Sequence, residues 1–192
     1  MSDSVLDPRF VRERLAALRA ADPHLQRFGA RKHRYRLGPP LREAQIQAFE
    51  QQYALQLPQD YRTFLLTVGN GGAGPSYGMA SLQDLGWEGL QRPFTPPSTF
   101  AAFEEEDICE DGVLLLCDHG CEQYSALVVR GDEFGQMFLL AEGWTPETPR
   151  WTDLWLLHHR NWIAAVEALY GEYERLPRRT FSQWYRAWLE HV

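Results

Sequence analysis

The spacing of hydrophobic residues predicts helices in the first third of the chain. Val11, Leu15 and Leu18 recur every three to four residues and follow Asp7-Pro8, a residue pair typical of a helix start. The same spacing appears twice more before Gly69, a typical helix stop. The pattern therefore predicts three helices, over 8–21, 41–54 and 58–68.

After residue 69 the pattern changes to short apolar runs separated by turn residues. Such runs have the length and punctuation of strands in an antiparallel meander. They predict strands over 113–117, 124–129 and 134–140, preceded by a short strand over 79–82. Helical spacing then returns over 151–170 and 180–190. The predicted fold class is α+β, with N-terminal helices, a central antiparallel β-meander sheet and C-terminal helices packed on it.

Residues 24–40 separate the first helix from the rest and carry many arginines. They contain no strong apolar pattern, so we interpret them as a connector. The expected organisation is an N-terminal helix with a basic connector over 1–36, followed by one α+β domain over 37–192.

Composition narrows the class of protein. The 192 residues are 44% hydrophobic, enough for a core, and no apolar run is long enough to cross a membrane. The first residues lack the apolar stretch of a secretory signal, so we expect a cytoplasmic protein without a membrane partner.

The net charge of −7 is unevenly distributed. Residues 1–43 hold ten Arg and Lys against five Asp and Glu, whereas residues 44–192 hold nine against twenty-one. Phosphate binding requires a basic face, so the acidic body argues against a nucleic-acid partner. The acidic body indicates either a basic partner or a charge that serves only to keep the protein soluble.

The acidic residues concentrate between Arg92 and Arg130, a tract without any basic side chain. One interpretation is a solvated loop, and the other is an electrostatic docking patch for a basic protein. The candidate partner-binding residues are Glu104, Glu105, Glu106, Asp107, Glu110 and Asp111.

Two motifs raise the question of catalysis or metal binding. Residues 74–78 match G-x-S-x-G around Ser76, but a nucleophile elbow needs a strand before the serine and a helix after it, and here the predicted order is reversed. Cys109, Cys117, His119 and Cys121 do not have the paired spacing of a structural zinc site, and buried apolar thiols are the commoner case. We therefore predict no catalytic residue, no metal and no cofactor, with the serine and the cysteine group kept as minor alternatives.

Several short motifs together resemble the bacterial branch of the SUKH superfamily, which includes the yeast cell-wall-assembly regulators. The most specific run is Leu57-Pro58, Asp60-Tyr61-Arg62, Phe64-Leu65 and then Gly69–Pro75 with Tyr77-Gly78. Weaker matches lie at Phe28-Gly29-Ala30, at Leu127–Val129 and at Phe181, Trp184-Tyr185 and Trp188-Leu189. The stretch 142–179 matches the pattern poorly and is interpreted as an insertion.

The resemblance implies an α+β domain without known catalysis. Bacterial members of the superfamily are typically immunity proteins, which bind and neutralise a cognate polymorphic toxin, often a nuclease. The expected partner is therefore a protein toxin, for example a basic nuclease. The alternative is an intracellular regulatory or scaffold protein like the yeast relatives, without a toxin. The sequence leaves the oligomeric state open.

Overall fold

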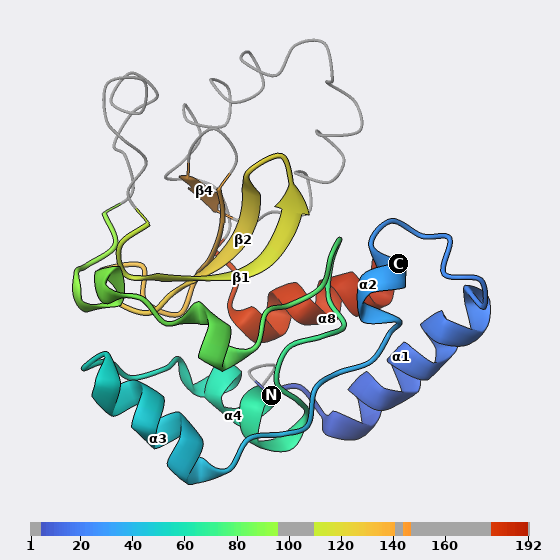
Figure 1. Ribbon diagram of the computed structural model, residues 1–192, viewed down its shortest axis with the longest axis horizontal. Helices are drawn as coiled ribbons and strands as arrows, with labels where there is room; N and C mark the ends of the chain where they lie inside the picture. The colour runs from blue at the N-terminus through green and yellow to red at the C-terminus, as the bar shows by residue number, and fades with distance from the viewer. Residues whose placement is uncertain (1–4, 96–109, 141–143, 147–177, 192) are drawn as a thin grey trace.

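The computed structural model describes residues 5–95, 110–140, 144–146 and 178–191 of the chain (Figure 1). In this part the chain is an α+β fold, as predicted. The helices are α1 (Pro8–Ala21), α2 (Ala30–His33), α3 (Glu43–Gln52), α4 (Gln59–Thr67) and α8 (Phe181–His191), with two short 3-10 helices, η1 (Leu82–Leu85) and η2 (Glu88–Gln91). The strands are β1 (Val113–Gly120), β2 (Gln123–Val128), β3 (Met137–Leu140) and β4 (Trp144–Pro146).

The strands form one antiparallel sheet in the order β1-β2-β3-β4, which confirms the meander. The sequence did not predict β4, which falls in the stretch interpreted as an insertion. The predicted strand over 79–82 is wrong. Met79 makes only isolated bridges to Gly72 and Cys117, and Leu82 already begins η1. The predicted helix over 151–170 lies outside the described residues.

The C-terminal helix α8 holds the N-terminal helices and the core together. It packs against α1 and α4 below the sheet (Figure 1). Phe64 of α4 lies 5.0 Å from Phe181 and 5.1 Å from Tyr185, measured between ring centroids. All three side chains are at most 2% exposed. Such edge-to-face contacts add to the free energy gained by burying the rings.

Two hydrogen bonds fix the position of α8. The carboxylate of Asp60 accepts the backbone N–H of Ser182, 2.8 Å away, and so satisfies an amide at the free N-terminus of α8. The hydroxyl of Tyr185 donates to the carbonyl oxygen of Ala73 at 2.9 Å. Both bonds join the C-terminal helix to motifs more than a hundred residues earlier.

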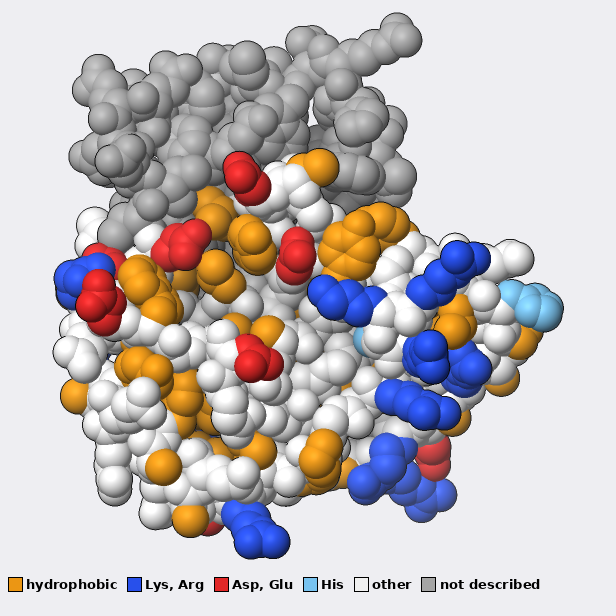
Figure 2. Space-filling view, in the orientation of Figure 1, with side chains coloured by type: hydrophobic (Ala, Val, Ile, Leu, Met, Phe, Trp, Pro, Cys, Tyr) orange, Lys and Arg blue, Asp and Glu red, His pale blue; other side chains and the backbone are white. Residues whose placement is uncertain are grey.

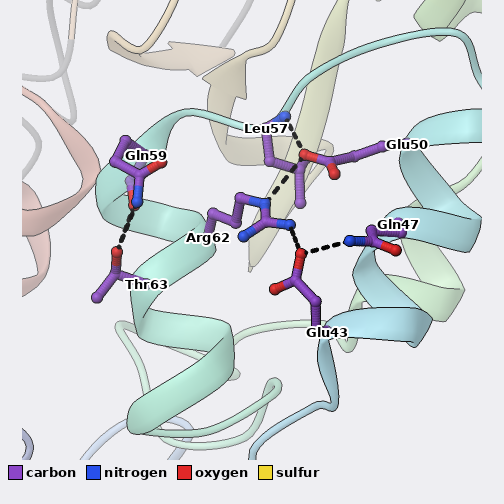
Figure 3. A network of polar contacts seen from close by, with 7 residues as sticks. All are labelled: Glu43, Gln47, Glu50, Leu57, Gln59, Arg62 and Thr63. Atoms are coloured by element: carbon purple, nitrogen blue, oxygen red, sulfur yellow. Dashed lines mark hydrogen bonds and ion pairs between the residues drawn. The ribbon is translucent and has the colours of Figure 1, made fainter.

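Arg62 links α4 to α3 (Figure 3). Its guanidinium binds the carboxylate of Glu43, and its Nε lies 3.4 Å from Oε1 of Glu50. Gln47 donates to Glu43, and Glu50 accepts the backbone N–H of Leu57. The hydrogen bond from Arg62, followed by that from Gln47, lowers the pKa of Glu43. Arg62 therefore has a structural role.

The glycine-rich loop over 69–78 passes close to other backbone segments. Gly72 has φ +96° and bridges to Leu37 and Met79, and a Cβ there would lie 2.3 Å from the carbonyl oxygen of Arg36. Gly78 has φ +89°, and its Cβ would lie 2.3 Å from the carbonyl oxygen of Gly72. Only glycine fits both the left-handed backbone and these distances.

Candidate functional site

A pocket of about 540 Å³ opens where β1 meets the glycine loop and η1. We call it the acidic pocket. Its charged lining residues are Asp84, Glu110, Asp118 and Lys32. Its other lining residues include the aromatic side chains Tyr77, Trp87 and Tyr124 and the apolar residues Leu85, Leu115 and Leu116. Among the described lining residues, carboxylates outnumber cations by three to one.

Local hydrogen bonds hold two of the three carboxylates. Asp84, at the end of η1, accepts the hydroxyl of Ser81 at 2.6 Å. Asp118 on β1 accepts the backbone N–H of Gly120 at 2.7 Å. Burial raises the pKa of Glu110 above its ordinary value. Glu110 is thus a partly desolvated carboxylate, which interacts more strongly with a cation than a fully solvated one does.

Aromatic rings on the pocket wall already contact cations of the chain itself. Lys32 Nζ lies 5.3 Å from the centroid of the Tyr77 ring, and the guanidinium carbon of Arg92 lies 5.9 Å from the Trp87 ring. The ring of Phe28, which is 65% exposed, packs 5.0 Å from Tyr77. Half-exposed aromatic side chains beside carboxylates are a typical composition of protein-binding surfaces for basic side chains.

Charge is separated across the face of the molecule shown in Figure 2. Acidic side chains lie among hydrophobic ones over the centre and left of this view. Lys and Arg gather on the right, over α1 and α2. On this face, the two signs of charge counted along the sequence are therefore largely separated.

The structure describes two of the six candidate partner-binding residues. Glu110 lines the acidic pocket, whereas Asp111 forms an ion pair with Arg92, with Nε–Oδ2 2.6 Å and Nη2–Oδ1 2.7 Å. The remaining four, Glu104, Glu105, Glu106 and Asp107, lie outside the described residues. Asp84, Asp118, Trp87 and Tyr124 were not predicted for this site. Asp118 and Tyr124 are paired across β1 and β2, but they meet Asp84 and Trp87 only when η1 packs against β1.

Comparison with known families identifies the family of this chain. The model of the SMI1 / KNR4 family (SUKH-1) matches residues 40–157, more than half of the chain. The chain belongs to the SUKH-1 family. Among curated proteins no match was found. Among solved structures none was found either.

The SUKH-1 match includes most of the acidic pocket and the specific motif run. In the structure, Asp60, Arg62 and Phe64 of that run bind α8, contact α3 and fill the core. These three residues therefore have structural roles, whereas Tyr77 and Gly78 at the end of the run line the acidic pocket. Residues 1–39, including α1, α2 and the basic connector, precede the match.

One arrangement in the SUKH-1 domain was not predicted from the sequence. Ser76 Oγ lies 2.7 Å from His119 Nδ1, and His119 Nε2 lies 2.7 Å from Ser125 Oγ. Ser76 has φ +45°, in the left-handed region. A serine, a histidine and a third polar group in a row are the parts of a nucleophilic site.

The environment of this serine–histidine–serine chain favours a structural role. Burial lowers the pKa of His119 to about 4, so the imidazole is a weak base at neutral pH. The third group is the hydroxyl of Ser125, which lacks the charge that stabilises an imidazolium in a catalytic triad. Among the described residues that line the acidic pocket, neither Ser76 nor His119 appears. The chain of hydrogen bonds joins the glycine loop to β1 and β2.

The cysteines do not converge within the described part of the chain. Cys117 is buried, Cys121 is exposed, and Cys109 lies outside the described residues. Among the described residues, no group of three or more His, Cys, Asp or Glu side chains is placed to hold a metal ion. Within the same residues, no helix has the length and apolarity needed to cross a membrane.

Proposed function

We propose that this protein is an immunity protein that neutralises a cognate bacterial toxin by binding it directly. The observation that carries the proposal is membership of the SUKH-1 family, which supports a protein-binding domain. The acidic pocket supports a basic protein as the partner, because its carboxylates and aromatic rings complement basic side chains. We place the protein in the cytoplasm, where it would meet a toxin that enters or is made in the cell.

The proposed mechanism is occlusion without catalysis. A nuclease toxin binds phosphates with a basic cleft. Carboxylates such as Asp84, Glu110 and Asp118 would occupy that cleft in place of phosphates, with the aromatic rings covering apolar surface around it. Opposite charges also accelerate association, which matters for an inhibitor that must bind before the toxin acts.

Glu104, Glu105, Glu106 and Asp107 remain predicted contributors to the same docking surface. They lie three to six residues before Glu110 in the sequence and carry the same sign of charge. Replacing all four by alanine is expected to weaken toxin binding at low salt more than threefold. An affinity within threefold of wild type would show that these four residues do not belong to the docking surface.

The test is rescue of growth. If a large secreted protein is encoded beside this gene, its C-terminal domain is expressed in a host that lacks this chain, and growth is measured with and without co-expression of the full chain. Rescue, together with co-purification of a stable complex, is the predicted result.

Two outcomes would contradict the proposal. If the neighbouring domain is toxic and the chain binds it without restoring growth, neutralisation is wrong. If the gene has no toxin neighbour and affinity capture from the native cell yields proteins whose toxicity the chain does not relieve, the regulatory or scaffold role of the yeast relatives is the better account.

A further inference from the structure

A second groove, of about 570 Å³, lies between α1 and the basic connector. We call it the arginine groove. Its charged lining residues are Arg12 and Arg19 of α1 and Arg34 and Arg36 of the connector. Among the described residues that line it, there is no Asp or Glu. All four arginines are exposed.

These arginines lack partners within the described part of the chain. The ion pairs found there involve other arginines, at positions 9, 62, 92, 178 and 186. A cluster of four like charges costs free energy through mutual repulsion, and this cost falls when an anion binds between them. An anionic partner would therefore lower the electrostatic free energy of these four arginines, which no carboxylate in the described part of the chain neutralises.

Helix geometry places two of the arginines on the same rim of the groove. Arg12 and Arg19 are seven residues apart, which is two helical turns, with Leu15 and Ala16 between them on the same face of α1. Leu15 is buried, so its side chain anchors α1 to the core. The helix therefore presents charge at both ends of an apolar strip.

The opposite rim is held by the backbone of the connector. Arg34 and Tyr35 both have positive φ, 53° and 57°, which costs free energy in residues other than glycine. The buried Tyr35 compensates by donating its hydroxyl to Asp22 at 2.8 Å. Burial and then this hydrogen bond raise the pKa of Tyr35 to about 12. The tyrosine is consequently fixed as a donor, and the flanking Arg34 and Arg36 both line the groove.

The floor of the groove is apolar. The apolar residues that line it are Leu15, Leu37, Pro39, Pro40 and Val68. A single phosphate group fills only a small part of 570 Å³, and it would leave this floor in contact with water. A ligand that fits must therefore combine negative charge at the rims with apolar groups in the middle.

We propose that the arginine groove binds an acidic segment of a second protein partner, in which carboxylates pair with the arginines and apolar side chains cover the floor. Arg guanidinium groups bind carboxylates in a two-point geometry, so two rims favour a segment with acidic residues on both sides of an apolar one. The partner is thus opposite in charge to the one that fits the acidic pocket.

A nucleic acid fits the groove less well. The single aromatic side chain among its described lining residues, Tyr35, is only 6% exposed and offers no face on which a base can stack. Residues 44–192 carry a net charge of −12, which repels a long polyanion. A short acidic peptide meets less of that repulsion.

The inference goes beyond the proposed function. The family match begins at residue 40, and of the residues that line the groove only Pro40 and Val68 fall within it. The groove thus lies mostly outside the residues that match the family. The presence or absence of a toxin partner for the acidic pocket therefore does not decide what the groove binds.

The test uses the full-length protein and a phage library of random twelve-residue peptides. Selection is run on the wild-type chain, and the selected peptides are synthesised with a fluorescent label for anisotropy titrations. We expect enrichment of sequences that alternate Asp or Glu with Leu, Ile or Phe, and affinity that decreases as salt rises.

Two double variants locate the binding. Arg12→Glu with Arg19→Glu changes only exposed helix positions, and Arg34→Glu with Arg36→Glu changes the connector rim. Each is expected to weaken peptide binding by about tenfold or more, as expected for reversing charges that pair with the ligand. The control is Arg31→Glu, which reverses one charge at an exposed position of α2 outside the groove and is expected to change affinity less than twofold.

Three results would overturn the proposal. The first is a selection without enrichment of acidic residues. The second is peptide affinity unchanged in both double variants while circular dichroism shows them folded. The third is tighter binding of a labelled dT12 oligonucleotide than of the best peptide, lost in the same variants, which would assign the groove to nucleic acid.

Discussion

At the scale of single residues, the fold changes the acid–base properties of His119. Its two ring nitrogens contact Ser76 and Ser125, and burial holds its pKa at about 4. The sequence contained all three residues but did not indicate that they meet, because Ser76 and His119 are 43 positions apart. Their contact depends on the bridge from Met79 to Cys117, which aligns the loop with β1.

His119 makes stability depend on pH. Its folded pKa, about 4, lies below the 6.5 of an unperturbed histidine, so between these values the unfolded chain binds a proton that the folded chain does not. The contribution is fully present above about pH 6.5 and is lost as pH falls toward 4. The shift corresponds to about 3 kcal/mol at most.

Urea unfolding at pH 7 and pH 4.5 measures this effect. The free energy of unfolding falls between pH 7 and pH 4.5, and this decrease should be about 2 kcal/mol smaller in His119→Gln than in wild type. The control is His24→Gln, a change at an exposed position, which should lose as much stability as wild type. Equal losses in wild type and His119→Gln would show that His119 is not responsible.

At the scale of elements, the sequence predicted what local spacing determines. The helix α1 and the order of the first three strands follow from apolar period and turn residues. The docking of α8 was not predictable in detail, because Asp60 and Ser182 meet only after the chain has folded. Similarly, the acidic pocket depends on η1, whose short 3-10 turn leaves no periodic signal.

The contact between Asp60 and α8 gives a prediction about stability. Asp60→Ala removes the acceptor for the N–H of Ser182 and is expected to lower the free energy of unfolding by about 1–2 kcal/mol, as for the loss of a helix cap. Chemical denaturation measures it, with Asp132→Ala, an exposed carboxylate between β2 and β3, as the control. Equal stabilities of the two variants would mean that this bond does not hold α8.

At the scale of the whole molecule, two surfaces of opposite charge share one fold. The sequence count of a basic N-terminal segment and an acidic body predicted the separation, but it did not place either charge around a cavity. The structure places three carboxylates around the acidic pocket and four arginines around the arginine groove. Such an arrangement allows two partners to bind without competing for one site.

The central claim is tested most directly by measuring, at low salt, the affinity of this chain for the toxin domain identified in the growth-rescue experiment. The variant combines Asp84→Asn, Glu110→Gln and Asp118→Asn, which remove charge from the acidic pocket and keep the side-chain shapes. Its control combines Glu88→Gln, Glu122→Gln and Asp132→Asn, the same loss of charge at exposed positions outside the pocket. We predict about tenfold weaker binding for the pocket variant and near-wild-type binding for the control. Equal affinities for wild type and the pocket variant, or no binding to the toxin domain at all, would contradict the account.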